Sequence, residues 1–241
     1  MIGEARQLSL FDVGPGPAAA PEQEALPLQA PASSPRQVAG GSTPGDAEWT
    51  RALAGAQDLS ALEAVVKGCR RCGLRAGCTQ VVFGEGNPRA RLMLVGEGPG
   101  QVEDETGRPF VGPAGQLLDR MLAAIGLRRQ DVYIANVVKC RPPSNRVPTP
   151  EEMAACWPNL RRQIELIRPQ VILCLGATAA HQLVEPRGSI SSLRGRWFVR
   201  DGIRYLVTFH PAALLRDPGK KPLAWQDLQM VQRALSEEKA S

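Results

Sequence analysis

The stretch Arg91–Gly115, RLMLVGEGPGQVEDETGRPFVGPAG, decides the fold class. Its first part, Leu92–Val95, is a short apolar run of the kind that a parallel strand covered on both faces requires. Gly96–Gly100 ends that run abruptly, and glycines allow the backbone to approach a ligand closely. Because open α/β sheets bind ligands at the carboxyl ends of their strands, we expect a binding site at this turn.

Three further apolar runs repeat the strand pattern, and segments with apolar residues at helical spacing lie between them. The predicted strands cover residues 92–95, 132–138, 171–175 and 203–209, and the predicted helices cover residues 59–67, 112–126, 150–167, 176–184 and 223–235. Ser60 and Thr149 are the expected caps of the first and third helices. This alternation predicts a three-layer α/β/α domain around a four-stranded parallel sheet.

The N-terminal segment differs in composition from the rest of the chain. Residues 12–55 hold seven prolines and no apolar periodicity, so we expect a disordered linker over residues 13–55 and the folded domain over residues 56–241. Ahead of this linker, Gln7–Phe11 (QLSLF) resembles the peptide with which bacterial DNA-processing proteins dock on the replicative sliding clamp. We interpret residues 1–12 as a clamp-binding peptide on a flexible tether. The alternative is an amphipathic end without a partner.

Charge is distributed unevenly along the chain. Residues 1–58 contain three Lys or Arg against seven Asp or Glu, and the remainder contains 26 against 17. A basic body suits a polyanionic partner, although a solubilising surface explains the same excess. No run approaches the roughly 18 apolar residues of a membrane span, and residues 1–10 lack the apolar core of a signal peptide. We therefore expect a cytoplasmic monomer that does not bind membranes.

Six cysteines in a chain without an export signal argue for metal or cluster ligation rather than a disulfide framework. Cys69 and Cys72 form a CxxC pair, whereas Cys140 follows a predicted strand and Cys156 lies in a predicted helix. A CxxC pair suits a redox site or half of a zinc site, and scattered cysteines suit an iron–sulfur cluster equally well. Cys174 is expected to be a small core residue, and Cys78 has no assigned role.

Several separate motifs follow one another between residues 66 and 235. They are CxxC at 69–72, GEGPG at 96–100, ED.TGRPFVGPAG at 103–115, N.VKCRPP.NR.P at 136–148, a cysteine at 156 and HPAALLR at 210–216. Together they resemble the family 4 uracil-DNA glycosylases, the iron–sulfur members of that superfamily. The resemblance implies the uracil-DNA-glycosylase-like fold, excision of uracil from single- or double-stranded DNA to leave an abasic site, and a [4Fe-4S] cluster. Its implied ligands are Cys69, Cys72, Cys140 and Cys156.

The resemblance also implies roles for residues around the glycine-rich turn. A glycosylase must flip the base out of the stack, hold it, read its edge and stabilise the departing anion. Phe110 is the expected stacking platform, Asn136 reads the uracil edge with its amide, and His210 donates to uracil O2 as negative charge develops there. A core aromatic and a structural strand-end cap are the alternatives for Phe110 and Asn136.

The turn Gly98–Gly100, with Pro99 between the two glycines, is expected to bind uracil and the catalytic water, and the backbone N–H groups of Gly98 and Gly100 are the expected donors. Classical members of the superfamily carry an Asp in this motif to orient the water, and Gly98 stands here instead. Glu97 and Glu103 are the candidate catalytic carboxylates, with Asp104 next in line. Glu103 has a second candidate role, crowding the methyl group of thymine. The sequence does not separate these roles.

DNA contacts are expected from the loops at the same strand ends. Leu214 and Leu215 resemble the wedge that fills the vacated stack, with helix-start packing as the alternative. The expected phosphate contacts are Lys139, Arg141, Arg146 and Arg216, for which a solvated loop is the alternative.

Two other functions compete with this interpretation. A related group of the superfamily traps uracil-DNA covalently through a histidine in an inserted basic loop, but residues 141–150 contain neither a histidine nor an insertion. A non-catalytic binding module or zinc protein is the second alternative. The turn lacks the GK[ST] of a P-loop and the G-x-G-x-x-G of a dinucleotide site.

Overall fold

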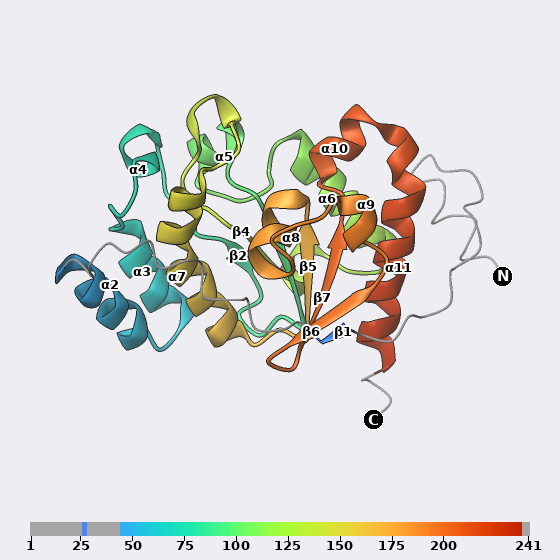
Figure 1. The fold of residues 1–241 in the computed structure, drawn as a ribbon, viewed down its shortest axis with the longest axis horizontal. Coiled ribbons are helices and arrows are strands. Elements are labelled where there is room, and N and C mark those ends of the chain that lie inside the picture. Colours follow the sequence, from blue (N-terminus) through green and yellow to red (C-terminus); the bar gives the residue numbers. More distant parts are fainter. Residues whose placement is uncertain (1–25, 28–43, 238–241) are drawn as a thin grey trace.

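The structure, a computed structural model, describes residues 26–27 and 44–237 (Figure 1). Its strands are β1 (Leu26–Pro27), β2 (Glu85–Gly86), β3 (Leu92–Gly96), β4 (Tyr133–Asn136), β5 (Val171–Leu175), β6 (Trp197–Arg200) and β7 (Ile203–Thr208). Its α-helices are α2 (Pro44–Gly55), α3 (Leu59–Lys67), α4 (Leu74–Gly77), α5 (Gln101–Thr106), α6 (Pro113–Ala124), α7 (Pro150–Ile167), α8 (Ala177–Leu183), α9 (Ile190–Leu193), α10 (Pro211–Arg216) and α11 (Lys221–Glu237).

One sheet in the order β1-β6-β7-β5-β3-β4-β2 forms the centre of the domain. Its four middle strands, β7, β5, β3 and β4, all run parallel, which confirms the predicted four-stranded parallel core. The sheet is wider than predicted because β6 pairs antiparallel with β7, β2 pairs antiparallel with β4, and β1 adds a short pairing with β6. These edge strands are short or only half-buried, so they lack the continuous apolar run of a central strand.

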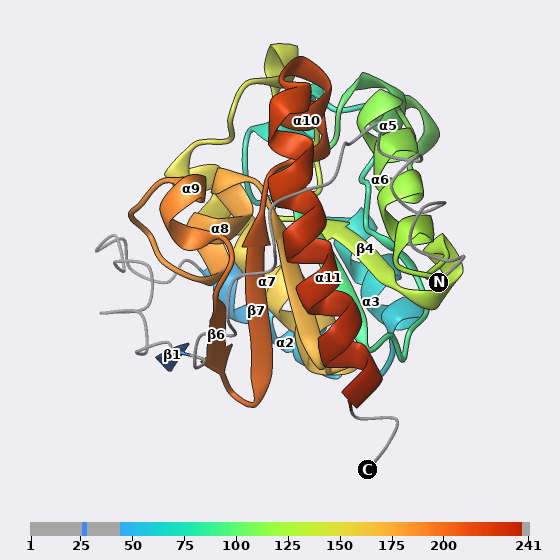
Figure 2. The same cartoon turned by 90° about the vertical axis from the view of Figure 1, so that its right-hand side faces the viewer.

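Helices cover both faces of this sheet. Successive residues of β3 point to opposite faces, as a strand requires. Met93 and Val95 pack with the hydrophobic residues of α3, α7 and α8, whereas Leu92 and Leu94 pack with those of α6 and α11. Figure 2 shows α11 in front of the sheet and α3 and α7 behind it. The predicted three-layer α/β/α fold is confirmed.

The N-terminal boundary of the folded part lies earlier than predicted. Helix α2 occupies the last part of the segment predicted as a disordered linker. Leu53 is buried and Trp49 is partly buried in the same hydrophobic cluster as α7, and Arg162 Nη2 donates to Ala56 O at 2.7 Å. Tertiary packing therefore stabilises this helix, although the proline- and glycine-rich sequence around it predicts a linker. The predicted clamp-binding peptide at Gln7–Phe11 lies outside the described residues.

Local differences concern caps and short helices. Asp58, not Ser60, caps α3, because its side chain accepts from Ala61 N at 2.8 Å. Thr149 caps α7 as predicted, in a capping box with Glu152. The short helices α5 and α10 were not among the predicted helices. None of the described helices is long and apolar enough to cross a membrane.

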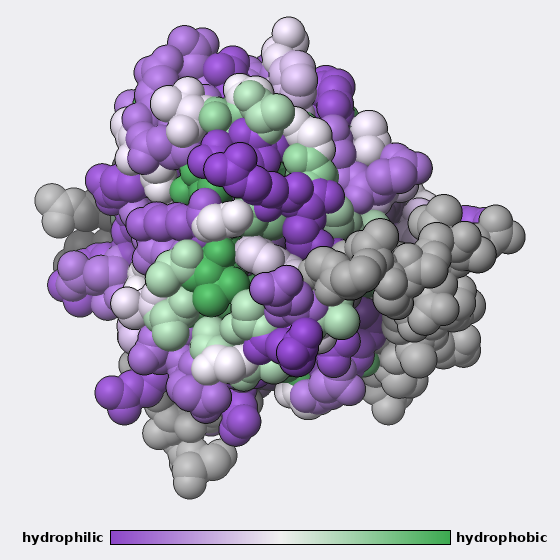
Figure 3. Space-filling model, turned by 90° about the vertical axis from the view of Figure 1, so that its left-hand side faces the viewer, coloured by the Kyte–Doolittle hydropathy of each residue, from purple (hydrophilic) through white to green (hydrophobic). Residues whose placement is uncertain are grey.

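The end of the molecule that carries α2, α3 and α7 presents a mostly hydrophilic surface with an apolar area near its centre (Figure 3). On the opposite side of the molecule, α11 forms part of the other helical layer. Between these layers, the carboxyl ends of the four parallel strands face the segments that carry α5, α8 and α10. The site described next lies at those strand ends.

Candidate active site

A cleft of about 530 Å³ opens at the carboxyl ends of β3, β4, β5 and β7. It gathers most of the residues that the sequence analysis singled out, although they are far apart in the chain. The predicted site residues that line it are Glu97, Gly98, Pro99, Gly100, Glu103, Phe110, Asn136, Arg146, His210 and Arg216. Arg141, Leu214 and Leu215 do not line it. The topology of a parallel sheet accounts for this convergence, since each strand delivers its next segment to the same edge.

Asn136, the last residue of β4, places a buried amide in this cleft. Its side chain is 2% exposed, and its Oδ1 atom has no hydrogen-bond partner among the described residues. An unsatisfied buried acceptor costs about 1–3 kcal/mol, so native proteins rarely keep one without a reason. The amide oxygen is therefore available to accept a hydrogen bond from a molecule that enters the cleft.

Gly96 allows two side chains to lie together at the floor of the cleft. A Cβ atom at this position would collide with the ring of Phe110 and would lie 2.6 Å from Asn136 Oδ1. Any side chain here would therefore displace the aromatic ring or the amide. The sequence predicted a close approach of a ligand to the Gly96–Gly100 turn, but not this contact of Gly96 with Phe110 and Asn136.

Phe110 is held in an uncommon backbone conformation, with φ of 53°. Arg129, in the 3₁₀ helix η1 (Arg129–Asp131), donates from its guanidinium to Phe110 O at 2.9 Å and also to Pro109 O. Glu103 Oε1 accepts from Val111 N at 2.9 Å and from Gly112 N at 2.8 Å. These contacts fix the loop from both sides. A left-handed residue retained by such a network is typical of a functional site.

His210 immediately follows β7 and caps α10. Its Nδ1 atom accepts from Ala212 N at 3.1 Å, so a neutral ring carries its proton on Nε2. Burial, assisted by the nearby charge of Arg216, lowers the pKa of His210 to about 4, while Glu103 opposes the shift. The ring centroid lies 5.5 Å from that of Phe110. His210 is therefore a neutral Nε2–H donor beside the aromatic ring at neutral pH.

Gly176 admits His210 to this position. The glycine has a φ of +89°, and a Cβ atom there would lie 2.9 Å from His210 Cβ. Only glycine adopts this backbone conformation without strain. The turn between β5 and α8 therefore makes room for the imidazole.

A pH dependence of stability follows from the low pKa of His210. The unfolded chain binds a proton on this residue below its ordinary pKa of 6.5, whereas the folded protein does so only near pH 4. The contribution of His210 to folding stability is therefore unchanged above pH 6.5 and becomes less favourable as pH falls from 6.5 to about 4. Urea titrations should show a shallower loss of stability across this window in His210→Gln; an identical slope in wild type and variant would contradict the assignment.

The two candidate carboxylates differ in their contacts. Glu97 Oε2 accepts a hydrogen bond from Thr178 Oγ1, a partner that the sequence did not predict, and the half-buried side chain lines the cleft. Glu103 directs one oxygen to the backbone of the Phe110 loop, as described above, so it positions that loop. Asp104 is buried and accepts from Thr79 N at 2.9 Å, which excludes it from the cleft.

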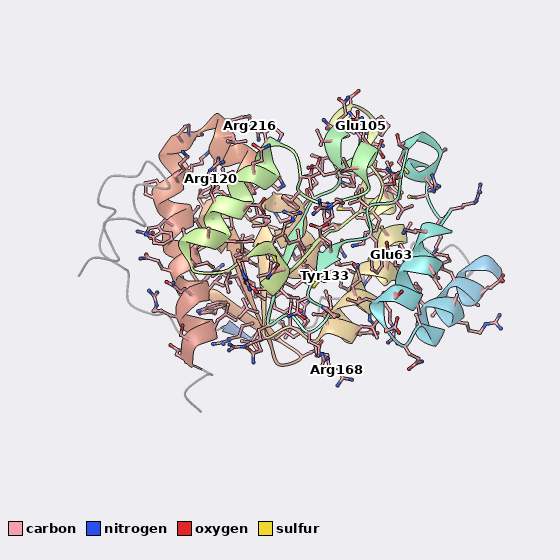
Figure 4. All side chains as sticks on the ribbon, turned by 180° about the vertical axis from the view of Figure 1, so that it is seen from behind. Glu63, Glu105, Arg120, Tyr133, Arg168 and Arg216 are labelled. Carbon is pink, nitrogen blue, oxygen red and sulfur yellow. The ribbon has the colours of Figure 1, made fainter. Side chains whose placement is uncertain are left out.

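The expected DNA contacts divide into exposed and buried residues. Arg216 is exposed, and Figure 4 labels it at the end of the molecule opposite to Arg168. Arg146 forms an ion pair with Glu152 at 2.7 Å, and Arg141 Nε donates to Asn145 Oδ1 at 2.7 Å.

Two of the predicted DNA contacts are wrong. Leu214 is fully buried in the cluster that contains α6, so it cannot act as a wedge, whereas Leu215 is 43% exposed. Lys139 is 2% exposed and cannot reach a phosphate. Its Nζ atom donates to Asn136 O at 2.9 Å and to Gln163 Oε1 at 2.6 Å. This lysine thus supports the backbone of Asn136 from inside the domain.

The four candidate ligand cysteines line one small cavity between α3, α4 and α7. They are Cys69, Cys72, Cys140 and Cys156. All six cysteines are free thiols, and Cys174 is fully buried in β5 as predicted. Burial raises the pKa of Cys140, and the nearby thiols of Cys78, Cys156 and Cys72 raise it further. Such close thiols favour a shared cationic centre that neutralises them.

The number and kind of side chains around this cavity bear on the centre that it could bind. Among the described residues, no three or more His, Cys, Asp or Glu side chains converge closely enough to bind one metal ion. A four-iron cluster is larger than one ion and holds its thiolates farther apart, and it takes four cysteines. The four cysteines that line this cavity match the number of thiolates that a four-iron cluster takes.

Comparison with known proteins places these features in a family. The uracil DNA glycosylase superfamily matches residues 83–229. The chain is 54% identical over 156 residues to a type-4 uracil-DNA glycosylase of Thermotoga maritima, a match that covers 63% of this chain and 80% of the relative. It is 48% identical over 163 residues to a type-4 uracil-DNA glycosylase of Archaeoglobus fulgidus, covering 64% and 81%. A type-4 uracil-DNA glycosylase of Pyrobaculum aerophilum is 42% identical over 181 residues, covering 72% and 92%.

Proposed function

We propose that this chain, which belongs to the type-4 uracil-DNA glycosylases, hydrolyses the N-glycosidic bond of uracil in DNA and leaves an abasic site as the first step of base excision repair. The observation that carries the proposal is the buried, unsatisfied Asn136 Oδ1 beside the Phe110 ring and the neutral imidazole of His210. This trio offers an acceptor, an aromatic face and a donor to one flat heterocycle.

The expected mechanism begins with a uracil turned out of the DNA stack into the cleft. The base stacks on Phe110 and donates from N3–H to Asn136 Oδ1, while the amide N–H group of Asn136 donates to uracil O4. As the glycosidic bond breaks, negative charge gathers on the base. His210 Nε2–H then donates to uracil O2 and stabilises the anion, a contribution that is largest in the transition state.

Glu97 is the carboxylate that we assign to the reacting sugar and water. Thr178 fixes one of its oxygens, and the side chain faces the cleft. Glu103 instead bonds the backbone of the Phe110 loop, so its contribution is to position the aromatic ring. Gly98, Pro99 and Gly100 line the cleft and complete the wall around the base, where the backbone N–H groups of Gly98 and Gly100 are the available donors.

The proposed cofactor is a [4Fe-4S] cluster bound by the thiolates of Cys69, Cys72, Cys140 and Cys156. Its contribution is structural, because it links α3 and the CxxC segment to the segment between Cys140 and Cys156. Purified protein should be yellow-brown with broad visible absorbance and four iron atoms per chain. Colourless protein with stoichiometric zinc would contradict the assignment.

A gel assay separates this function from its two rivals. A labelled oligonucleotide with one uracil is incubated with the protein and then treated with alkali. Strand cleavage at the uracil supports the glycosylase, a covalent protein–DNA adduct indicates the trapping relatives, and unchanged DNA indicates a non-catalytic binding protein. A matched oligonucleotide with thymine at the same position is the control.

Leu215 is proposed as the residue that fills the space vacated by the flipped base. It is exposed and directly precedes Arg216, which lines the cleft, whereas its neighbour Leu214 is buried. Because unstacking a base costs a few kcal/mol in a duplex and less in a single strand, the wedge matters most on duplex DNA. Leu215→Ala should lower kcat/KM severalfold on duplex uracil DNA and much less on single strands. Equal losses on both substrates would contradict this role.

The N-terminal peptide and the cellular setting complete the proposal. We propose that Gln7–Phe11 binds the sliding clamp and raises the local concentration of the enzyme at replicated DNA. Deleting residues 1–12 should abolish clamp binding in a pull-down and leave excision from free oligonucleotides intact. Unchanged clamp binding would overturn this part.

A cytoplasmic monomer is the expected form. The monomer is supported by a cleft that one chain completes.

A further inference from the structure

The sulfur of Cys156 accepts a hydrogen bond from a buried amide. Asn159 Nδ2 donates to Cys156 Sγ at 3.7 Å, within the range of hydrogen bonds to sulfur. Asn159 is 1% exposed, and the two residues lie on one face of α7 because they are three positions apart. An N–H donor to a ligand sulfur stabilises the thiolate and changes the properties of the metal centre it binds.

Trp49 determines which end of this amide faces the sulfur. Its indole Nε1 donates to Asn159 Oδ1 at 3.2 Å. An indole N–H group is a donor only, so it fixes the oxygen of the amide toward α2 and leaves the NH2 group toward Cys156. Without the indole donor, the orientation of the amide is no longer fixed. Its oxygen can then face the thiolate, and the partial negative charge of the oxygen and the charge of the thiolate repel each other.

Helix α2 carries Trp49 to this position, although it precedes the 83–229 family match. Figure 1 shows α2 beside α3 and α7. Leu53 packs in the same cluster, and Arg162 of α7 donates to Ala56 O just beyond α2. The helix is therefore anchored on the same element that carries the cysteine.

We propose that Trp49 and Asn159 are positioning residues for the cluster: the indole orients the amide, and the amide donates to the Cys156 thiolate and slows loss of the cluster. The inference rests on the proposed [4Fe-4S] assignment and goes beyond it. It also gives α2 a function, since the helix carries the indole that donates to Asn159.

The test compares the rates at which holoenzymes lose their visible absorbance to an iron(II) chelator under anaerobic conditions. Trp49→Phe keeps the aromatic packing and removes only the N–H donor, and Asn159→Asp keeps the shape and removes the amide donor. Outer-shell substitutions of this kind commonly weaken metal binding by about 10-fold or more. Asn159→Asp should lose the cluster about 10-fold faster than wild type, and Trp49→Phe should lose it faster in the same direction. Trp197→Phe, on β6 in the other hydrophobic cluster, is the matched control and should behave as wild type.

A double variant tests whether Trp49 acts through Asn159. In an Asn159→Ala background, Trp49→Phe should add no further acceleration, because the bond that it orients is already absent. Wild-type rates in both Trp49→Phe and Asn159→Asp would overturn the inference. If the buried Asp of Asn159→Asp prevents folding, the rate of cluster loss measured for Trp49→Phe decides the test by itself. Wild-type protein that contains no iron would instead overturn the cluster assignment and this inference with it, whatever the result of the uracil assay.

Discussion

Replacing His210 with alanine should lower kcat on single-stranded uracil DNA by about 10²- to 10³-fold. The side chain is a neutral Nε2–H donor. Its Nδ1 atom accepts a hydrogen bond from Ala212 N, and burial lowers the pKa of the ring to about 4. Its hydrogen bond to uracil O2 strengthens as the bond breaks, so its loss acts on kcat more than on KM.

His181→Ala provides the matched control for this experiment. His181 is the other histidine of the chain, lies on α8 and contacts Gly188 O at 2.9 Å, away from the cleft. It should retain wild-type turnover. Near-normal turnover in His210→Ala, with the visible absorbance of the cluster retained as a check on folding, would contradict the assigned role.

Replacing Asn136 with alanine should lower kcat/KM by at least about 100-fold, because two hydrogen bonds to the uracil edge are lost in a buried site. The variant also removes the buried Oδ1 atom, which has no hydrogen-bond partner among the described residues. The free protein should therefore be no less stable than expected for the lost side-chain volume, while activity falls sharply. This separation of stability from activity distinguishes a substrate contact from a structural cap.

Asn87→Ala is the control for the asparagine substitution. Asn87 Oδ1 accepts from Arg89 N at 2.9 Å in an exposed turn, so its loss affects local structure only. Steady-state rates on the same oligonucleotide and urea titrations of both variants provide the measurements. If Asn136→Ala retained wild-type kcat/KM, the amide would be a structural cap of β4.

The sequence was sufficient to predict the central sheet and most of the cleft. Continuous apolar runs such as Val171–Leu175 identify doubly covered strands, and a parallel sheet brings the residues that follow them to one edge. The residues after β3, β4 and β7 therefore converge whatever the helices between them do. This reasoning accounts for the meeting of Glu97, Asn136 and His210.

Burial of individual side chains was harder to predict. Lys139 stands in a basic, proline-rich segment typical of phosphate contacts, but Gln163 of a distant helix supplies the partner that allows its burial. Leu214 and Leu215 are identical in type, and only the direction of α10 decides which one is buried. The burial of such side chains depends on tertiary contacts, which local sequence patterns do not indicate.

Helix α2 illustrates the same limit for secondary structure. Its flanks are rich in proline and glycine, so composition indicates a linker. Trp49 and Leu53 nevertheless lie one helical turn apart and pack on α7. Tertiary contacts override weak local preference here, and they order the segment that supplies the indole donor to Asn159.

The most direct test of the account is the amount of free uracil released from a single-stranded oligonucleotide by a sub-stoichiometric amount of enzyme. The amount of released uracil should far exceed the amount of enzyme, increase until the substrate is consumed, and match the number of alkali-labile sites. Uracil release that stops at one equivalent per enzyme with a covalent adduct, or no release at all, would contradict it.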